Sequence, residues 1–131
     1  MLKQFCLPAV FLAAALPAFA DQAGQEEYMT ACAVCHGESG MGAGPMAEYL
    51  NVEVPGLTTM KKDNDGVFPF LETFMVVDGR TGVRGHGSEM MPIWGDRYKA
   101  ATIEAAGEYG AETIIRGRIY SLVLYLESIQ E

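Results

Sequence analysis

Apolar positions near the end of the chain repeat with the period of an α-helix. Five of them step by four, three, four and three residues, which places them on one stripe of a helix. They are Ile115, Ile119, Leu122, Leu126 and Ile129. The sequence therefore predicts a terminal helix that buries this stripe against a core.

Two further segments have helical patterns. In residues 21–35 small and apolar side chains fall near one stripe, and the polar residues 25–27 face outward. Residues 68–77 form the second pattern, with Pro69 in the first turn and Gly79 after the end. The pattern as a whole predicts an all-α fold with the helices joined by loops.

The intervening segments favour loops. Residues 36–45 contain five glycines or prolines in ten positions, and Pro45 is expected to open a short helix that ends at Leu50. Residues 51–62 have no clear period, and the glycines of residues 80–87 indicate a loop. No assignment follows for residues 90–97 and 100–110, where neither period is clean.

The first twenty residues have the features of a secretory signal peptide. Lys3 precedes an apolar run over residues 5–19, which ends in Ala18-Phe19-Ala20. The run is short for a membrane span and contains two prolines. We expect cleavage after Ala20, loss of Cys6 with the leader, and a periplasmic domain over residues 21–131 with no transmembrane segment.

Length and charge narrow the class of protein further. The 131 residues suffice for one compact domain, and nine Lys plus Arg against seventeen Asp plus Glu give a formal charge of −8. A nucleic-acid binder that works by neutralising phosphates is therefore not expected.

The most specific motif is Cys32-Ala33-Val34-Cys35-His36. Two thiols three residues apart can each add to a haem vinyl group, and the adjacent imidazole can bind the iron. A redox disulfide and half of a zinc site are the alternatives, but the first lacks a βαβ pattern and the second has only His86 as a further histidine. One motif predicts one covalently bound haem per chain.

The sixth iron ligand decides the function. A protein ligand suits electron transfer, whereas an open position suits gas binding or peroxide chemistry. Met91 is favoured because it follows His36 by 55 residues and precedes Pro92, which stiffens the backbone. The alternatives left open are Met90, His86 and Met60, while Met75 lies in a predicted helix and is assigned to packing.

These motifs together resemble the class I cytochromes c, specifically the small exported bacterial monohaem proteins with an M-P-x-W-G loop. The resemblance covers most of residues 24–129, and its two specific pieces are residues 32–36 and 91–95. Weaker pieces are residues 40–45, 57–58, 78–80 and 122–126. The resemblance implies a cytochrome c fold, in which the first and last helices cross and short helices and loops wrap one haem.

The resemblance also implies roles for individual residues. His36 and Met91 would be the axial ligands, and the Pro45 carbonyl would accept a hydrogen bond from the His36 imidazole, setting its tautomer. At the helix crossing, Gly24 and Tyr28 would meet Leu122 and Tyr125.

Residues flanking the proposed ligand loop have two possible roles. Trp94 would either donate its indole N–H to a haem propionate or wall the haem pocket. Arg80 and Arg84 would either neutralise propionates or remain solvated charges.

These expectations define an electron carrier and not an enzyme. The iron would cycle between two oxidation states and exchange electrons with redox partner proteins, and no substrate would be transformed. The alternative is a cytochrome subunit held permanently by a larger oxidoreductase complex. The acidic chain lacks the lysine-rich haem face of mitochondrial-type carriers, so a partner should meet a neutral, partly apolar haem edge or present basic groups.

Overall fold

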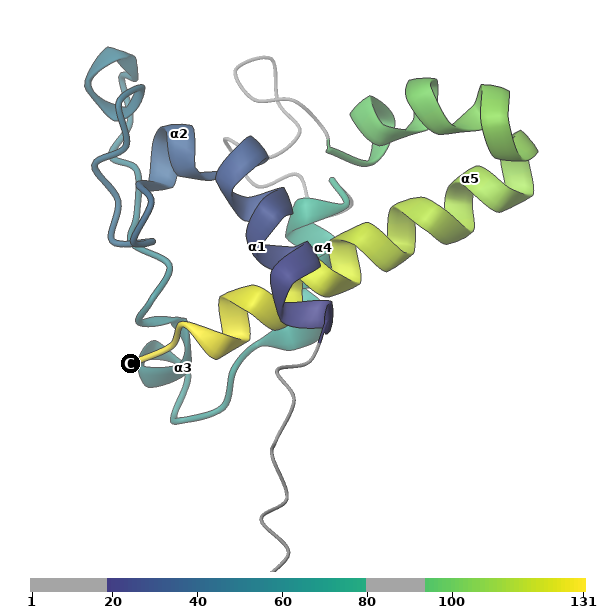
Figure 1. Ribbon diagram of the computed structural model, residues 1–131. Coiled ribbons are helices and arrows are strands. Elements are labelled where there is room, and N and C mark those ends of the chain that lie inside the picture. The colour runs from purple at the N-terminus through teal and green to yellow at the C-terminus, as the bar shows by residue number, and fades with distance from the viewer. Residues whose placement is uncertain (1–18, 80–93) are drawn as a thin grey trace, which may run out of the picture.

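The computed structural model describes residues 19–79 and 94–131, with side chains from 22–79 and 102–131. Every regular element in these ranges is a helix, which agrees with the all-α prediction. The elements are α1 (Phe19–Ala31), α2 (Ala33–His36), the 3₁₀ turn η1 (Ala47–Tyr49), α3 (Met60–Asp63), α4 (Phe70–Val77) and α5 (Trp94–Ser128), as Figure 1 shows.

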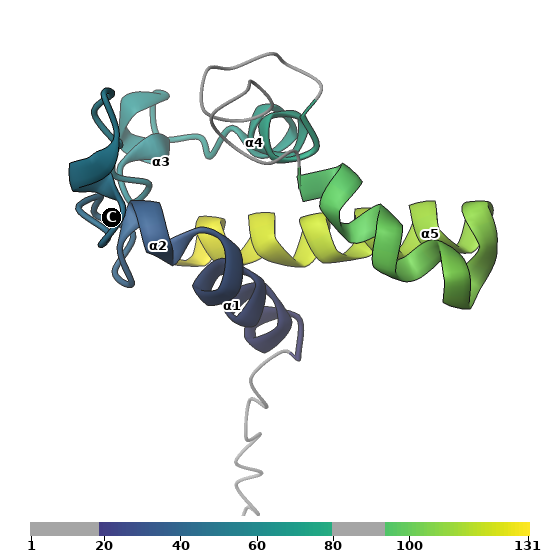
Figure 2. The same ribbon diagram turned by 90° about the horizontal axis from the view of Figure 1, so that it is seen from above.

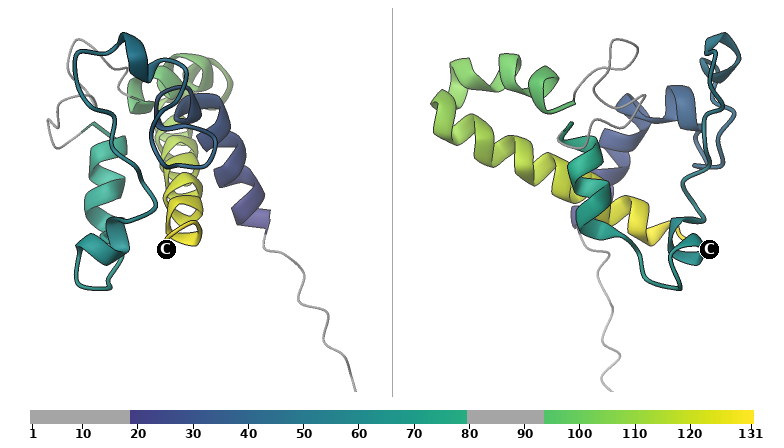
Figure 3. Two further views of the ribbon diagram at one scale, coloured as in Figure 1. Left: turned by 90° about the vertical axis from the view of Figure 1, so that its left-hand side faces the viewer. Right: turned by 180° about the vertical axis from the view of Figure 1, so that it is seen from behind.

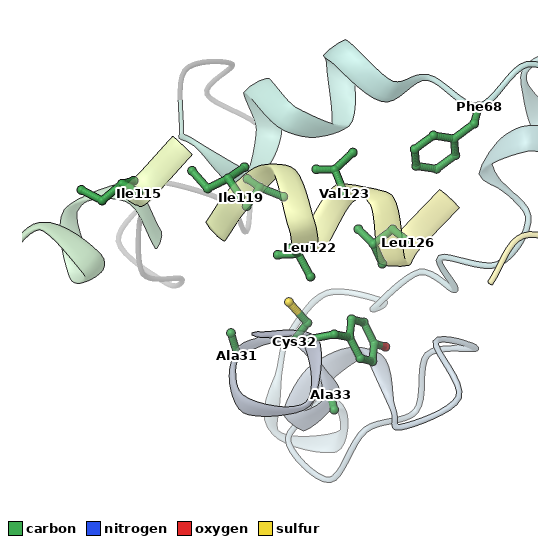
Figure 4. Packing of buried hydrophobic residues seen from close by; sticks show 11 residues of the cluster. Ala31, Cys32, Ala33, Phe68, Ile115, Ile119, Leu122, Val123 and Leu126 are labelled. Carbon is green, nitrogen blue, oxygen red and sulfur yellow. The ribbon is translucent and has the colours of Figure 1, made fainter. Parts of the chain in front are cut away.

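The last half of α5 is the centre of the fold. It contacts both α1 and α4, and it lies between them in two perpendicular views (Figures 2 and 3). The stripe predicted from the sequence is buried over Ile115, Ile119, Leu122 and Leu126. Figure 4 shows Leu122 pointing toward Cys32 and Val123 pointing toward α4, so the two sides of α5 bury different neighbours.

The crossing of α1 and α5 agrees with the resemblance noted above. A Cβ atom at Gly24 would overlap the Ser121 carbonyl oxygen and lie 2.7 Å from the Cβ of Tyr125. The rings of Tyr28 and Tyr125 pack with their centroids 5.3 Å apart. Only glycine lets the two backbones approach this closely.

The chain's C-terminus is tied to the segment that precedes and begins α3. The Gln130 side-chain amide donates to the carbonyl oxygens of Leu57 and Leu126, both at 2.7 Å, and its Oε1 accepts from the Lys61 backbone N–H at 2.9 Å. The Glu131 N–H adds a bond to the Thr58 carbonyl at 2.9 Å. No sequence pattern predicted this clamp.

The main departure from the sequence-based expectation is the length of α5. The helix begins at Trp94, continues through residues 100–110 and bends back on itself (Figure 1). Gly107 is the non-helical position inside it, with φ 67° and ψ 173°, a conformation that L side chains rarely adopt. Alanines favour the helix on both sides, while the glycine supplies the bend.

The other elements follow the predictions closely. The segment predicted as one helix over residues 21–35 is α1 followed by α2, and the short helix predicted after Pro45 is the single turn η1. The predicted helix over residues 68–77 is α4, whereas residues 51–62, expected to be irregular, contain the start of α3. Residues 80–87 lie outside the described ranges.

None of the helices in the described ranges has both the length and the apolar character that crossing a bilayer requires.

Replacing Gly24 tests the helix crossing. Gly24→Ala is expected to lower the free energy of unfolding by about 1–3 kcal/mol, because the added methyl group overlaps the backbone of α5. Gly117→Ala is the matched control: it lies in α5 with nothing within 4 Å of an added Cβ, and should gain up to about 1 kcal/mol of helix propensity. Urea unfolding of the holoprotein measures both, and equal effects would contradict the crossing.

Gln130→Ala tests the C-terminal clamp. Loss of three hydrogen bonds is expected to cost about 1–3 kcal/mol of unfolding free energy, measured by urea unfolding. Glu127→Ala, an exposed change one turn earlier, should stay within about 0.5 kcal/mol of the parent. A Gln130 variant as stable as the Glu127 variant would show that the clamp contributes nothing.

Candidate functional site: the Cys-x-x-Cys-His segment

The two thiols and the imidazole share one face of a helical segment. Helices α1 and α2 are separated by a single residue, Cys32, and its N–H still bonds to the Tyr28 carbonyl at 2.8 Å. The His36 N–H bonds to the Cys32 carbonyl at 2.9 Å. Positions i, i+3 and i+4 of a helix lie on the same side, so Cys32, Cys35 and His36 can address one group.

Cys32 lies in the core, and its sulfur points toward Leu122 (Figure 4). Burial raises the pKa of the Cys32 thiol to about 12, and the nearby Cys35 and Glu27 add to the shift. Both cysteines are free of disulfides. A thiol that stays protonated at neutral pH is a poor redox nucleophile, and no group of three or more His, Cys, Asp or Glu that could hold a metal ion occurs in the described part of the chain.

The His36 ring is fixed by a hydrogen bond at Nδ1. The side chain is buried, and Nδ1 lies 3.0 Å from the carbonyl oxygen of Pro55. A carbonyl only accepts, so Nδ1 carries the proton and the lone pair of the neutral ring is on Nε2, the nitrogen that would bind iron. Burial lowers the pKa of the imidazole, although the bond to Pro55 partly opposes that shift, and the neutral form required of a ligand is favoured.

The acceptor is therefore Pro55, and the assignment of this role to Pro45 is wrong. After His36 the chain turns tightly, with bonds from Gly42 to the His36 carbonyl and from Met46 to the Val34 carbonyl. These turns place Pro45 in an exposed position beside α2. The chain then leaves through η1 and returns, and this second passage brings the Pro55 carbonyl to the ring.

Sequence reasoning missed Pro55, although a signal was present. The matching piece Leu57-Thr58 begins two residues after it, and the Leu57 N–H bonds to the Gly40 carbonyl at 2.6 Å. This bond joins the segment around Leu57 to the loop that follows His36. Pro55 lies just before that anchor, so the piece that matched weakly marks the acceptor's position.

Tyr28 connects the helix crossing to the site. Its hydroxyl donates to the Gly37 carbonyl at 2.6 Å, immediately after His36, while its ring packs on Tyr125. Burial raises the pKa of Tyr28 to about 12, with smaller contributions from Cys32 and Tyr125. The side chain thus holds the loop after the histidine against α5.

The remaining predicted site residues divide into two groups. Met60 lies in α3 and packs against the core, and Met75 lies half-buried in α4 as predicted. Trp94 is the first residue of α5, and its side chain is outside the described part. Also outside the described residues are Arg80, Arg84, His86, Met90 and Met91.

The donor set fits a covalently attached haem. Two free thiols at helical spacing suit attachment to the two vinyl groups, and a neutral imidazole with a fixed tautomer suits the iron.

The family model for cytochrome c matches residues 22–109. No match was found among curated proteins or among solved structures. The matched residues include the attachment motif and run from α1 to the bend of α5, so the chain belongs to the cytochrome c family. Its all-α cytochrome c fold is confirmed, and membership implies covalently bound haem c, electron transfer through the haem iron, and redox partner proteins.

Replacing Tyr28 by Phe tests the link between the crossing and the site. At pH 9 the variant should be about 1 kcal/mol less stable, because the buried hydrogen bond to Gly37 is lost. The pKa of Tyr28 is about 12 in the fold and about 10 for an unperturbed phenol. The contribution of Tyr28 to the free energy of unfolding is therefore complete below pH 10 and is lost as the pH rises toward 12. The deficit of the variant should therefore shrink between pH 9 and pH 11.

Unfolding of the holoprotein at the two pH values measures this difference. Tyr109→Phe is the control, because Tyr109 is 89% exposed and should show no deficit at either pH. A Tyr28 deficit that is the same at pH 9 and pH 11 would contradict the raised pKa.

Proposed function

We propose that this chain is a periplasmic one-electron carrier with one haem, whose iron is bound by His36 and Met91. The observation that supports it most is the hydrogen bond from His36 Nδ1 to the Pro55 carbonyl, beside two free cysteines on the same helical face. This arrangement orients a neutral imidazole in advance, as a permanent axial ligand requires. Such an orientation limits the structural change that accompanies electron transfer.

Each residue of the motif has a distinct task. Cys32 and Cys35 would form the two thioether links to a haem, and His36 would supply a nitrogen ligand to its iron. When bound, the haem supplies a one-electron couple between ferric and ferrous iron. The single motif in the sequence sets the proposed stoichiometry at one haem per chain.

Met91 is proposed as the sixth ligand on sequence grounds. The piece Met91-Pro92-Ile93-Trp94-Gly95 resembles the ligand loop of class I cytochromes c, and a thioether opposite an imidazole raises the reduction potential. The start of α5 at Trp94 gives the loop a helical anchor three residues later. Trp94 and Arg80 are proposed to contact the haem, most simply at its propionates.

The location and the type of activity are further parts of the proposal. Residues 1–20 would direct export and be removed, and residues 21–131 would form the mature monohaem domain. With both iron faces occupied by the chain, no position is left for a substrate, so the protein would transfer electrons without acting as an enzyme.

Met91→Ala is the experiment that tests this function. The ferric holoprotein should lose the thioether–iron absorption band, its potential should fall by on the order of 0.1 V, and the reduced form should bind carbon monoxide. Met75→Leu is the control, because Met75 lies half-buried in α4 and is not among the candidate ligands, so it should change none of the three.

Two outcomes would contradict the proposal. Retention of the band and potential in the Met91 variant would move the ligand to Met90, His86 or Met60. Carbon monoxide binding by the unmodified reduced protein at neutral pH would indicate an open iron site and count against a carrier.

A permanently bound subunit of a larger oxidoreductase would use the same residues. Exposed apolar side chains such as Tyr49, 71% exposed, are compatible with this alternative as well, because lasting and short-lived partners both cover such groups. Purification of the native holoprotein distinguishes the two, since a subunit would come with a second polypeptide in fixed ratio.

A further inference from the structure

Apolar side chains are exposed on the segment that wraps the haem-attachment motif. Five of them occur within 19 residues, in α2 and in the loop that contains η1. They are Val34, Met41, Met46, Tyr49 and Val52, called here the η1 face. Exposed apolar groups that gather in one region mark sites of interaction.

The backbone places the central members of the η1 face side by side. The Met46 N–H bonds to the Val34 carbonyl at 2.9 Å, which joins the loop to α2. The Tyr49 N–H bonds to the Met46 carbonyl at 3.1 Å, and residues i and i+3 of a 3₁₀ turn are eclipsed. Met46 therefore neighbours both Val34 and Tyr49 along the backbone.

The η1 face has no competing partner within the described fold. The loop with η1 lies beyond α2, on the side away from α4 and from the bend of α5, in both Figure 1 and Figure 2. Methionine and tyrosine are the residue types that interfaces prefer, because one adapts its shape and the other contributes a large rigid contact.

The charged residues of the segment that carries the η1 face have one sign. Residues 19–60 contain no Lys or Arg, and Glu38, Glu48 and Glu53 are all exposed there. Acidic groups around an apolar centre complement a surface with an apolar centre and a basic rim. They also repel other acidic proteins and steer a basic partner at long range.

We propose that the η1 face is the docking surface for a redox protein that presents an apolar patch rimmed by Lys or Arg. The inference rests on the proposed carrier function. Val34 lies between the two haem-attaching cysteines, so a partner seated on this face contacts the attachment segment itself. A surface of five side chains suits the small, short-lived complexes of electron-transfer proteins.

The chemistry of this partner can be imitated by tris(1,10-phenanthroline)cobalt(III), a cation with apolar rings. In the assay one electron passes from the reduced holoprotein to cobalt(III), which becomes cobalt(II), and stopped-flow absorbance follows the rate. Glu48→Lys with Glu53→Lys should slow this reaction about fivefold and accelerate oxidation by anionic ferricyanide. Tyr49→Ser should slow the cobalt reaction alone.

Matched controls separate a local surface from net charge and from exposure in general. Glu104→Lys with Glu108→Lys makes the same charge change on exposed residues near the α5 bend, and Tyr109→Ser removes an even more exposed ring. Both should leave the cobalt rate within about twofold of the parent. Equal slowing by the two lysine pairs, or by the two serine variants, would overturn the proposal.

A binding measurement complements the kinetics. Redox-inert tris(1,10-phenanthroline)ruthenium(II) should shift the amide resonances of Val34, Met46 and Tyr49 in the ferrous holoprotein, and not those of residues 104–112. Shifts confined to another region would overturn the docking surface. Failure of the carrier function is distinguishable, because a chain without a reducible haem would show no absorbance change with either oxidant.

Discussion

The hydrogen bond between His36 Nδ1 and the Pro55 carbonyl is the constraint on which the site depends. An imidazole that ligates iron must be neutral, must present one particular nitrogen and must not rotate. The carbonyl satisfies all three conditions at once, since it selects the tautomer and fixes the ring from behind. Residues 37–54 form a loop through η1 that brings the chain back to α2, and this path places the Pro55 carbonyl beside the His36 ring.

The same region is secured from the opposite side by the helix crossing. Tyr28 packs on Tyr125 and donates to the Gly37 carbonyl, which joins α5 to the first residue after the histidine. Gln130 and Glu131 then tie the end of the chain to residues 57–61. The Tyr28 side chain therefore connects the helix packing directly to the segment that carries the histidine.

The fixed His36 ring and the acidic, partly apolar surface around η1 have different roles in electron transfer. Rigidity limits the rearrangement around the metal, whereas the exterior determines which proteins approach and where they dock. The family relationship establishes electron transfer through a haem in general terms. The exposed side chains around η1 belong to this chain's own sequence, and they connect the second role to the attachment segment.

Local patterns determined a large part of this protein. The spacing of Cys32, Cys35 and His36 on a helical turn and the buried stripe of α5 are properties of neighbouring residues or of helical periodicity, and a sequence displays both. The close approach at Gly24 was expected only from the resemblance to class I cytochromes c. Long-range pairing decided the rest. Pro45 and Pro55 both lie in loops, and the backbone carbonyl of either could accept a hydrogen bond. Only the folded path of the chain selects Pro55, because a hydrogen bond across 19 residues leaves no periodic pattern in the sequence. The clamp by Gln130 is likewise a contact between distant segments, and the helix from Trp94 to Gly107 was hidden because glycine marks a bend and an end equally well.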